Sequence, residues 1–308
     1  RSMHATKELM RPISIARLAR AEPHAVAALH AGLRSGVGAA LVKHRRAHAL
    51  ILARLRRASA EFFLEPTAAK AAASNHSSCP AFGPMPVLVG WRRPSDSKEL
   101  YRSFAGESLP ASTPGRLRTL ACAAQRLLHH ALVVCLRTIL RAAGARCPAR
   151  AVRELLVGTQ KGAQRLNCAL DLFYYPNDAA AVSPNCTPHV DRGYLSAIVV
   201  SDVPGLVLLD GAARRLVSPC QIWPRARPHE HTVVLVNHAL QALDATGWSN
   251  TSPVVPTNNE PPPLMACTHA VTKASAPRLS ISYELRPAFG TGADDPVEWV
   301  IRNGRAKG

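Results

Sequence analysis

The chain has 308 residues, of which 47% are hydrophobic and 19% charged, a composition that excludes a disordered protein and provides for a sizeable core. The formal net charge is +18, but the arginines are spread along the chain and aromatic residues make up only 5%, which disfavours a nucleic-acid surface. The eight cysteines form no C-x-x-C pair, so we expect free thiols in a reducing compartment. No apolar run approaches 18 residues and no targeting signal stands out, so we expect a cytoplasmic protein without a membrane partner. We also expect it to be a monomer.

Residues 1–150 combine short strand-like runs with longer helical patterns. Strand-like runs occupy 12–18 and 36–42, whereas helical spacing of apolar residues predicts helices over 25–33, 47–63 and 117–143. The last of these ends at Gly144 and Pro148. Residues 74–94 are rich in Ser, Pro and Gly and are expected to form a loop. The sequence therefore predicts a mostly helical segment over 1–150.

Beyond residue 160 the pattern changes to short strands separated by Pro, Asn and Gly, at 166–176, 195–202, 205–209, 231–237, 264–272 and 278–285. Many short strands without intervening helices predict an α+β protein whose core, residues 151–308, is a jelly roll of the cupin type, with the N-terminal helical segment packed on it. Residues 249–263 read as an insertion. It is either a mobile flap near a pocket or a surface elaboration without a role.

The stretch from 186 to 196 carries the most informative residues. His189 and Asp191 are two positions apart, so on an extended strand they project to one side and can bind one ion. His269 is the preferred third ligand because Arg278-Leu-Ser280 follows it at the start of another strand; the competing candidates are His229, His231 and His238. Two His and one carboxylate suit non-haem Fe(II).

A structural zinc site is the competing interpretation of the same residues. Cys186-x-x-His189 and Cys267-x-His269 together offer the two thiolates and two imidazoles of a tetrahedral zinc site. This hypothesis leaves Asp191 unused and gives no role to Arg278 and Ser280.

An ordered series of motifs resembles the plant-type Fe(II)/2-oxoglutarate-dependent dioxygenases, the group that includes isopenicillin N synthase. The similar segments are Leu172-Phe-Tyr-Tyr-Pro176, His189-Val-Asp191-Arg-Gly193-Tyr-Leu195-Ser196, Gly205-Leu-Val-Leu208, Val236-Asn237, His269-Ala-Val271 and Arg278-Leu-Ser280, and residues 12–18, 60–70 and 98–101 resemble the family's leading helical segment. The chain departs from the family at Phe173, which replaces Asn, and at His238-Ala239-Leu240, which replaces x-Gly-Asp. The gap from His189 to His269 is also wider than the family's.

The resemblance implies that His189, Asp191 and His269 bind Fe(II), and that Arg278, Ser280 and Tyr175 bind 2-oxoglutarate. The expected reaction consumes O2, releases succinate and CO2, uses ascorbate as an auxiliary reductant, and hydroxylates or desaturates a small organic molecule. Three alternatives stay open: an isopenicillin-N-synthase-like oxidase in which Arg278 and Ser280 hold the substrate's own carboxylate, a nucleobase or nucleic-acid oxygenase, and an inactive binding protein.

Asp171 and Phe173 are the candidate substrate residues. If Tyr175 faces the barrel interior, strand alternation places Phe173 and Asp171 on the same face. A carboxylate in a pocket needs a donor or cation beside it, which suggests a substrate with an amine or hydroxyl near an apolar body. Alternatively, Asp171 pairs with an arginine such as Arg165 or Arg192 and only supports the barrel.

Overall fold

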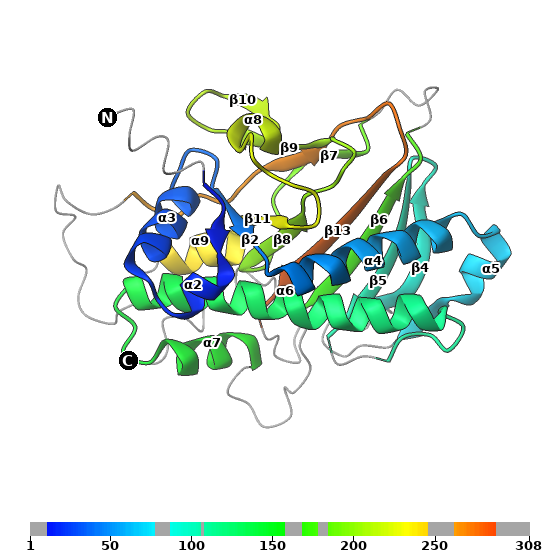
Figure 1. The fold of residues 1–308 in the computed structure, drawn as a ribbon, viewed down its shortest axis with the longest axis horizontal. Coiled ribbons are helices and arrows are strands. Elements are labelled where there is room, and N and C mark those ends of the chain that lie inside the picture. Colours follow the sequence, from blue (N-terminus) through cyan, green and yellow to red (C-terminus); the bar gives the residue numbers. More distant parts are fainter. Residues whose placement is uncertain are drawn as a thin grey trace.

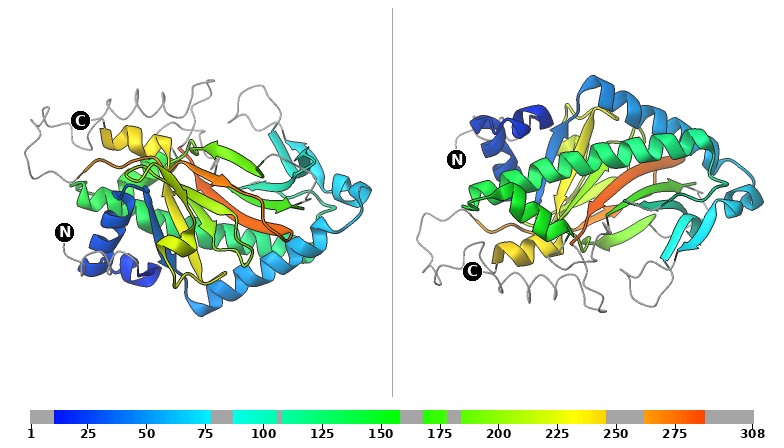
Figure 2. Two further views of the ribbon diagram at one scale, coloured as in Figure 1. Left: turned by 90° about the horizontal axis from the view of Figure 1, so that it is seen from above. Right: turned by 90° about the horizontal axis from the view of Figure 1, so that it is seen from below.

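The computed structural model describes residues 11–77, 87–105, 108–157, 168–177, 184–245 and 262–287 (Figure 1). Two β-sheets form the core, and long helices cover the outer face of the larger one (Figure 2). Arg165 and all but the last two residues of the 249–263 insertion lie outside the described residues, so the flap hypothesis stays a prediction.

The larger sheet contains strands from both halves of the chain. Its order is β1 (Ile13–Ser14), β2 (Ala39–Lys43), β11 (His231–Val236), β8 (Leu195–Val199), β13 (Arg278–Leu285), β6 (Ala169–Tyr175), β5 (Lys98–Phe104), β4 (Val87–Ser95) and β3 (Ser74–Ser77). The smaller sheet runs β10 (Arg215–Val217), β9 (Leu206–Asp210), β12 (His269–Val271) and β7 (Cys186–His189). All described strand pairs are antiparallel except β1 with β2.

The helices of the described chain are α2 (Ile15–Ala19), α3 (Pro23–Leu33), α4 (Arg46–Phe63), α5 (Thr67–Ala72), α6 (Gly115–Ala142), α7 (Pro148–Val157), α8 (Pro219–Ile222) and α9 (His238–Ala245). Helices α4 and α6 lie side by side across the larger sheet (Figures 1 and 2). Helix α6 is long and apolar enough to cross a membrane by length and composition. Its apolar stripe nevertheless faces the protein core, through buried residues that include Leu117, Ala121, Ala124, Leu128, Cys135 and Ile139.

Strand alternation separates the core from the site. On β13, Leu279, Ile281 and Tyr283 belong to the core cluster that includes α4 and α6. The intervening Ser280 and Ser282 line a cavity between the sheets instead. One strand thus anchors the helices with one face and supplies polar groups to the site with the other.

The jelly roll predicted from the short strands is confirmed, together with the helical layer packed on it. Strands from both sides of residue 150 share one sheet and α7 spans that residue. The division into 1–150 and 151–308 is not otherwise tested and stays a prediction.

Three local predictions for the N-terminal part are wrong. Residues 74–77 and 87–94 belong to β3 and β4, not to a loop, and Lys98–Phe104 is strand β5, not helix. The strand-like run at 12–18 is a strand only over Ile13–Ser14 and continues as α2. Strands β4 and β5 form a hairpin held by pairing with β6, a contact over about 70 residues of sequence that local patterns do not report.

Candidate metal centre and cofactor pocket

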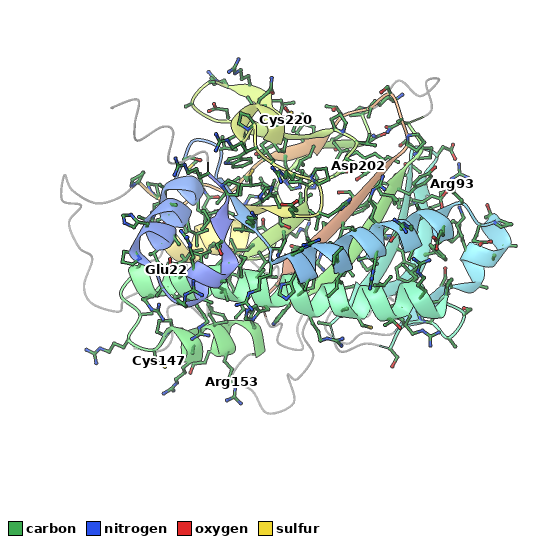
Figure 3. The ribbon with its side chains drawn as sticks, viewed as in Figure 1. Glu22, Arg93, Cys147, Arg153, Asp202 and Cys220 are labelled. Carbon is green, nitrogen blue, oxygen red and sulfur yellow. The ribbon has the colours of Figure 1, made fainter. Side chains whose placement is uncertain are left out.

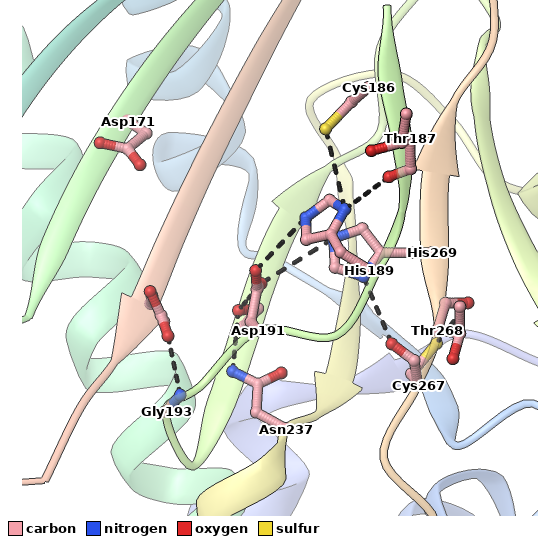
Figure 4. A network of polar contacts seen from close by, with 12 residues as sticks. Asp171, Cys186, Thr187, His189, Asp191, Gly193, Asn237, Cys267, Thr268 and His269 are labelled. Atoms are coloured by element: carbon pink, nitrogen blue, oxygen red, sulfur yellow. Dashed lines mark hydrogen bonds and ion pairs between the residues drawn. The ribbon is translucent and has the colours of Figure 1, made fainter. Parts of the chain in front are cut away.

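His189, Asp191 and His269 meet between the two sheets (Figure 4). One ligand atom from each lies within 4.8 Å of the others. Nε2 of His189 is 3.6 Å from Asp191 Oδ1, and Nε2 of His269 is 3.9 Å from Asp191 Oδ2. Two imidazoles and a carboxylate facing one point form the donor set that suits non-haem Fe(II).

The smaller sheet brings the two histidines together. His269 on β12 pairs directly with His189 on β7, so two residues 80 positions apart become cross-strand neighbours with ring centroids 4.3 Å apart. Nδ1 of His189 bonds to the Thr187 carbonyl at 2.8 Å, and Nδ1 of His269 bonds to the Cys267 carbonyl at 3.3 Å. With both Nδ1 atoms donating to carbonyls, the Nε2 atoms are left to face Asp191.

A chain of two hydrogen bonds holds the Asp191 carboxylate in place. The Ser196 hydroxyl donates to Asp191 Oδ2. The side-chain amide of Asn237 (labelled in Figure 4) in turn donates from Nδ2 to Ser196 Oγ at 3.0 Å. Ser196 and Asn237 are each 1% exposed, so this support is shielded from water. The sequence motifs contain both residues, but their positioning role becomes visible only in the fold.

The two histidines differ in protonation. The hydrogen bond with the Cys186 thiol raises the pKa of His189 to about 9, so this imidazole holds a proton at neutral pH that a metal would displace. Burial lowers the pKa of His269, which is therefore neutral and ready to bind a cation. Removal from water outweighs the attraction of Asp191 at this position.

The triad opens onto a cavity of about 230 Å³ between the sheets. Tyr175 and Ser280, two of the residues expected to bind 2-oxoglutarate, line it together with the triad. Arg278 lies two residues before Ser280 on the same face of β13 and over the Tyr175 ring, with its guanidinium carbon 5.7 Å from the ring centroid. The three predicted cofactor residues therefore form one cluster.

Arg278 is only 2% exposed. It lines a second cavity of about 250 Å³, which adjoins the triad's cavity because Leu206 lines both. Its Nε and Nη1 atoms are buried and have no hydrogen-bond partner among the described residues. Burial lowers the pKa of this guanidinium, yet a guanidinium stays charged. A buried charge with two unused donors is suited to an incoming carboxylate.

Asp171 and Phe173 both line the triad's cavity, as strand alternation predicts. The partner of Asp171 is Arg102 on β5, with Arg102 Nε and Nη2 each 2.6 Å from a carboxylate oxygen. The arginine that pairs with it is therefore neither Arg165 nor Arg192, the two that the sequence suggested. Burial alone would raise the pKa of Asp171, but Arg102 together with Arg286 and Arg92 outweighs it and holds that pKa below its ordinary value.

The rival histidines lie elsewhere. His231 Nδ1 accepts the backbone N–H of Arg227 at 2.7 Å, and His238 is exposed at the start of α9. His229 has a positive φ of 62° in the turn before β11. None of the three belongs to the metal-competent cluster of the described residues.

No family model and no curated protein matches the chain, but many solved structures do. The similarity shows the fold, which this chain shares with solved oxygenases that include complexes with 2-oxoglutarate. A full-length Neurospora crassa protein, solved in complex with alpha-KG and thymine, has a TM-score of 0.67 and 14% identity over 96% of each chain. The rice dioxygenase for auxin oxidation has a TM-score of 0.62 and 20% identity over 90% of this chain and 83% of its own. Its Arabidopsis thaliana counterpart, a complex with 2-oxoglutarate, has a TM-score of 0.61 and 14% identity over 86% and 88%.

Proposed function

We propose that the protein is an Fe(II)- and 2-oxoglutarate-dependent oxygenase that hydroxylates or desaturates a small organic molecule. The observation that carries this proposal is the convergence of His189, Asp191 and His269 on a cavity that Tyr175 and Ser280 also line. Iron and 2-oxoglutarate would together supply the oxidising chemistry, with O2 consumed and succinate and CO2 as co-products. The similarity to structures that contain alpha-KG supports the same reaction class.

Each residue of the cluster has a defined task. His189, Asp191 and His269 would hold the metal on one side, which leaves the cavity side open to reactants. Arg278 would pair with the distal carboxylate of 2-oxoglutarate through its unused donors, and the Ser280 and Tyr175 hydroxyls would add hydrogen bonds. The Ser196 hydroxyl keeps Asp191 oriented.

The structural zinc hypothesis is disfavoured by the state of the two cysteines. Cys267 is packed in an apolar cluster where burial raises the pKa of its thiol to about 12, and neither cysteine belongs to the metal-competent cluster of the described residues. Cys186 lies 3.7 Å from Nδ1 of His189, on the side of the ring opposite the Nε2 atom that faces Asp191.

Nucleic acid is a less suitable substrate than a small molecule. The exposed arginines are distributed over the surface: Arg93 on β4 and Arg153 on α7 lie on opposite sides of the molecule (Figure 3). A binding groove for nucleic acid concentrates basic side chains along one face.

The described cysteines are free thiols, which supports our proposal of a reducing, cytoplasmic location for a monomeric enzyme.

The test is anaerobic titration of the Fe(II)-loaded protein with 2-oxoglutarate, monitored by the visible charge-transfer band of the keto acid on iron. We expect the band to appear and to saturate. Arg278→Lys keeps the charge but loses the planar fork, so the dissociation constant for 2-oxoglutarate should rise about tenfold or more. The exposed Arg225→Lys is the matched control and should titrate as the unmodified protein does.

Two results would contradict the proposal. If Arg278→Lys titrates normally, this arginine does not bind the keto acid. If an oxidised product forms at full rate without any keto acid, the isopenicillin-N-synthase-like oxidase is the correct alternative.

A further inference from the structure

The triad's cavity is lined by more charged groups than the iron and cofactor sites require. Strands β4, β5, β6 and β13, with the residue that follows β13, line it with the basic residues Arg92, Lys98, Arg102 and Arg286 and the acidic residues Asp171 and Glu284. Phe173, Leu206 and Val271 add apolar surface. Some of these charged groups have a partner inside the protein, and others do not.

Both acidic residues are neutralised by neighbours. Asp171 has the two-point ion pair with Arg102. Glu284 Oε2 accepts a hydrogen bond from Arg286 Nε at 2.6 Å, and its Oε1 accepts the Gly193 backbone N–H at 2.8 Å. Neither carboxylate therefore leaves a surplus negative charge for a cationic substrate, which removes the electrostatic basis of the amine hypothesis.

Two of the basic residues have no such partner. Arg92 and Lys98 line the cavity without a hydrogen bond or ion pair to any other described residue. Lys98 Nζ instead lies over the Phe173 ring, 4.8 Å from its centroid, and Phe173 stacks on Tyr175 with the centroids 6.0 Å apart. An aromatic wall with a cation above it can hold a flat apolar body next to an anionic group.

We propose that the cavity selects a small organic acid as substrate, whose carboxylate pairs with Lys98 and Arg92 while its apolar body lies against Phe173. This inference rests on the proposed oxygenase function and specifies its substrate class. The cavity volume of about 230 Å³ is below the range of about 300–1,000 Å³ common for small-molecule sites and must also hold the co-substrate, which favours an acid with no more than a single ring. Leu206 and Val271 continue the apolar wall.

The test compares two probes that differ in charge but hardly in shape, phenylacetate and phenylacetamide. Calorimetric titration of the anaerobic Fe(II) and 2-oxoglutarate complex measures binding without turnover. Phenylacetate should bind about tenfold more tightly than the amide, a preference that shrinks between low and high salt because the pairing groups are partly exposed. Lys98→Gln and Arg92→Gln should each reduce the preference to about threefold or less.

Matched controls lie on the same and on a distant strand. Arg93→Gln changes the neighbour of Arg92 that is exposed and paired with Asp96, and Lys43→Gln removes an exposed lysine at the end of β2. Both should keep the full preference for phenylacetate. Thermal unfolding of all four variants should match the unmodified protein, because none of the substituted side chains is buried.

Three outcomes would overturn the inference: equal binding of acid and amide, binding of neither probe although 2-oxoglutarate binds, or a loss of 2-oxoglutarate affinity in Lys98→Gln and Arg92→Gln with phenylacetate binding unchanged. The last would assign these cations to the co-substrate. Failure of the unmodified protein to bind 2-oxoglutarate would instead contradict the proposed function. In that case the preference for phenylacetate over phenylacetamide can still be measured on the unmodified protein in the absence of 2-oxoglutarate.

Discussion

The ion pair between Asp171 and Arg102 separates a structural from a substrate-binding role for Asp171. The pair is bidentate, and the two side chains keep only 11% and 19% of their exposure. Breaking a fully buried pair costs about 3–5 kcal/mol, whereas surface pairs contribute about 0–1 kcal/mol. We therefore expect Asp171→Asn to lower the free energy of unfolding by about 2–3 kcal/mol, which for a chain of this size lowers Tm by roughly 3–5 °C.

Urea unfolding of a double-mutant cycle measures this contribution. Arg102→Gln and the double variant complete the cycle, and the coupling energy should be about 2 kcal/mol because each single change leaves its partner's charge uncompensated. Asp96→Asn is the matched control, because Asp96 pairs with Arg93 but its side chain is fully exposed. That change should cost no more than about 0.5 kcal/mol.

The pH dependence has a defined sign. Arg102 keeps the pKa of Asp171 below its ordinary value in the folded protein, so the unfolded chain binds this proton more readily. The stabilisation is therefore complete above the unfolded pKa of about 3.9 and is lost as the pH falls through the lower folded value. The difference in stability between the unmodified protein and Asp171→Asn should shrink below about pH 4.

Two results would refute this reasoning. One is an Asp171→Asn variant that unfolds within about 0.5 kcal/mol of the unmodified protein, with a coupling energy near zero. The other comes from binding: removing the carboxylate leaves Arg102 uncompensated, so phenylacetate should bind at least as tightly as before. A large loss of substrate turnover in Asp171→Asn, with Fe(II) and 2-oxoglutarate still bound and phenylacetate binding weakened, would restore Asp171 as a substrate-recognition residue.

Four further changes test the metal centre by titration with Co(II) as a visible probe. His269→Ala should abolish stoichiometric binding while the circular dichroism of the fold persists, and His231→Ala should not; the reverse result would reassign the third ligand. Ser196→Ala removes the donor to Asp191 and should weaken metal binding about 10–100-fold, and an unchanged affinity would show that the hydrogen bond does not orient the ligand. His238→Pro removes the backbone amide that donates to the Asp191 carbonyl, but proline is tolerated at the first residue of a helix such as α9. Metal binding should therefore weaken about tenfold or less while the helix content is retained. A circular dichroism spectrum that shows loss of α9 would contradict this prediction.

Much of the site could be predicted because strand alternation is a local property. The two-residue period correctly placed Asp171, Phe173 and Tyr175 on one face, and it explains why Ser280 faces the cavity. The third ligand was less certain, because four histidines followed Asp191 at plausible distances. The sequence favours His269 through the Arg278-Leu-Ser280 that follows it, and the register of β12 against β7, which places His269 opposite His189, decides among them.

The N-terminal strands could not be predicted because their stability depends on distant partners. Strand β5 contributes Arg102 to an ion pair with β6 and Glu99 to a buried pair with Lys70 on α5. Its sequence, Lys-Glu-Leu-Tyr-Arg-Ser-Phe, has no strong strand propensity of its own. The two unpaired cations of the cavity, Arg92 on β4 and Lys98 on β5, lie on strands that the sequence did not predict, so their role in the cavity was missed as well.

The departure from the family motif after Asn237 has a structural explanation. His238-Ala239-Leu240 begins α9, and the first backbone amides of a helix have no partner within the helix. In this chain they turn back to the metal-binding loop: His238 N–H donates to the Asp191 carbonyl at 3.0 Å, and Ala239 N–H donates to the Gly193 carbonyl at 3.0 Å. The loop that carries Asp191 is therefore held by main-chain groups, which any residue except proline can supply. The exposed side chain at 238 is free to vary, whereas Ala239 is buried in the core and Asn237 reaches Asp191 through Ser196, so neither of these is.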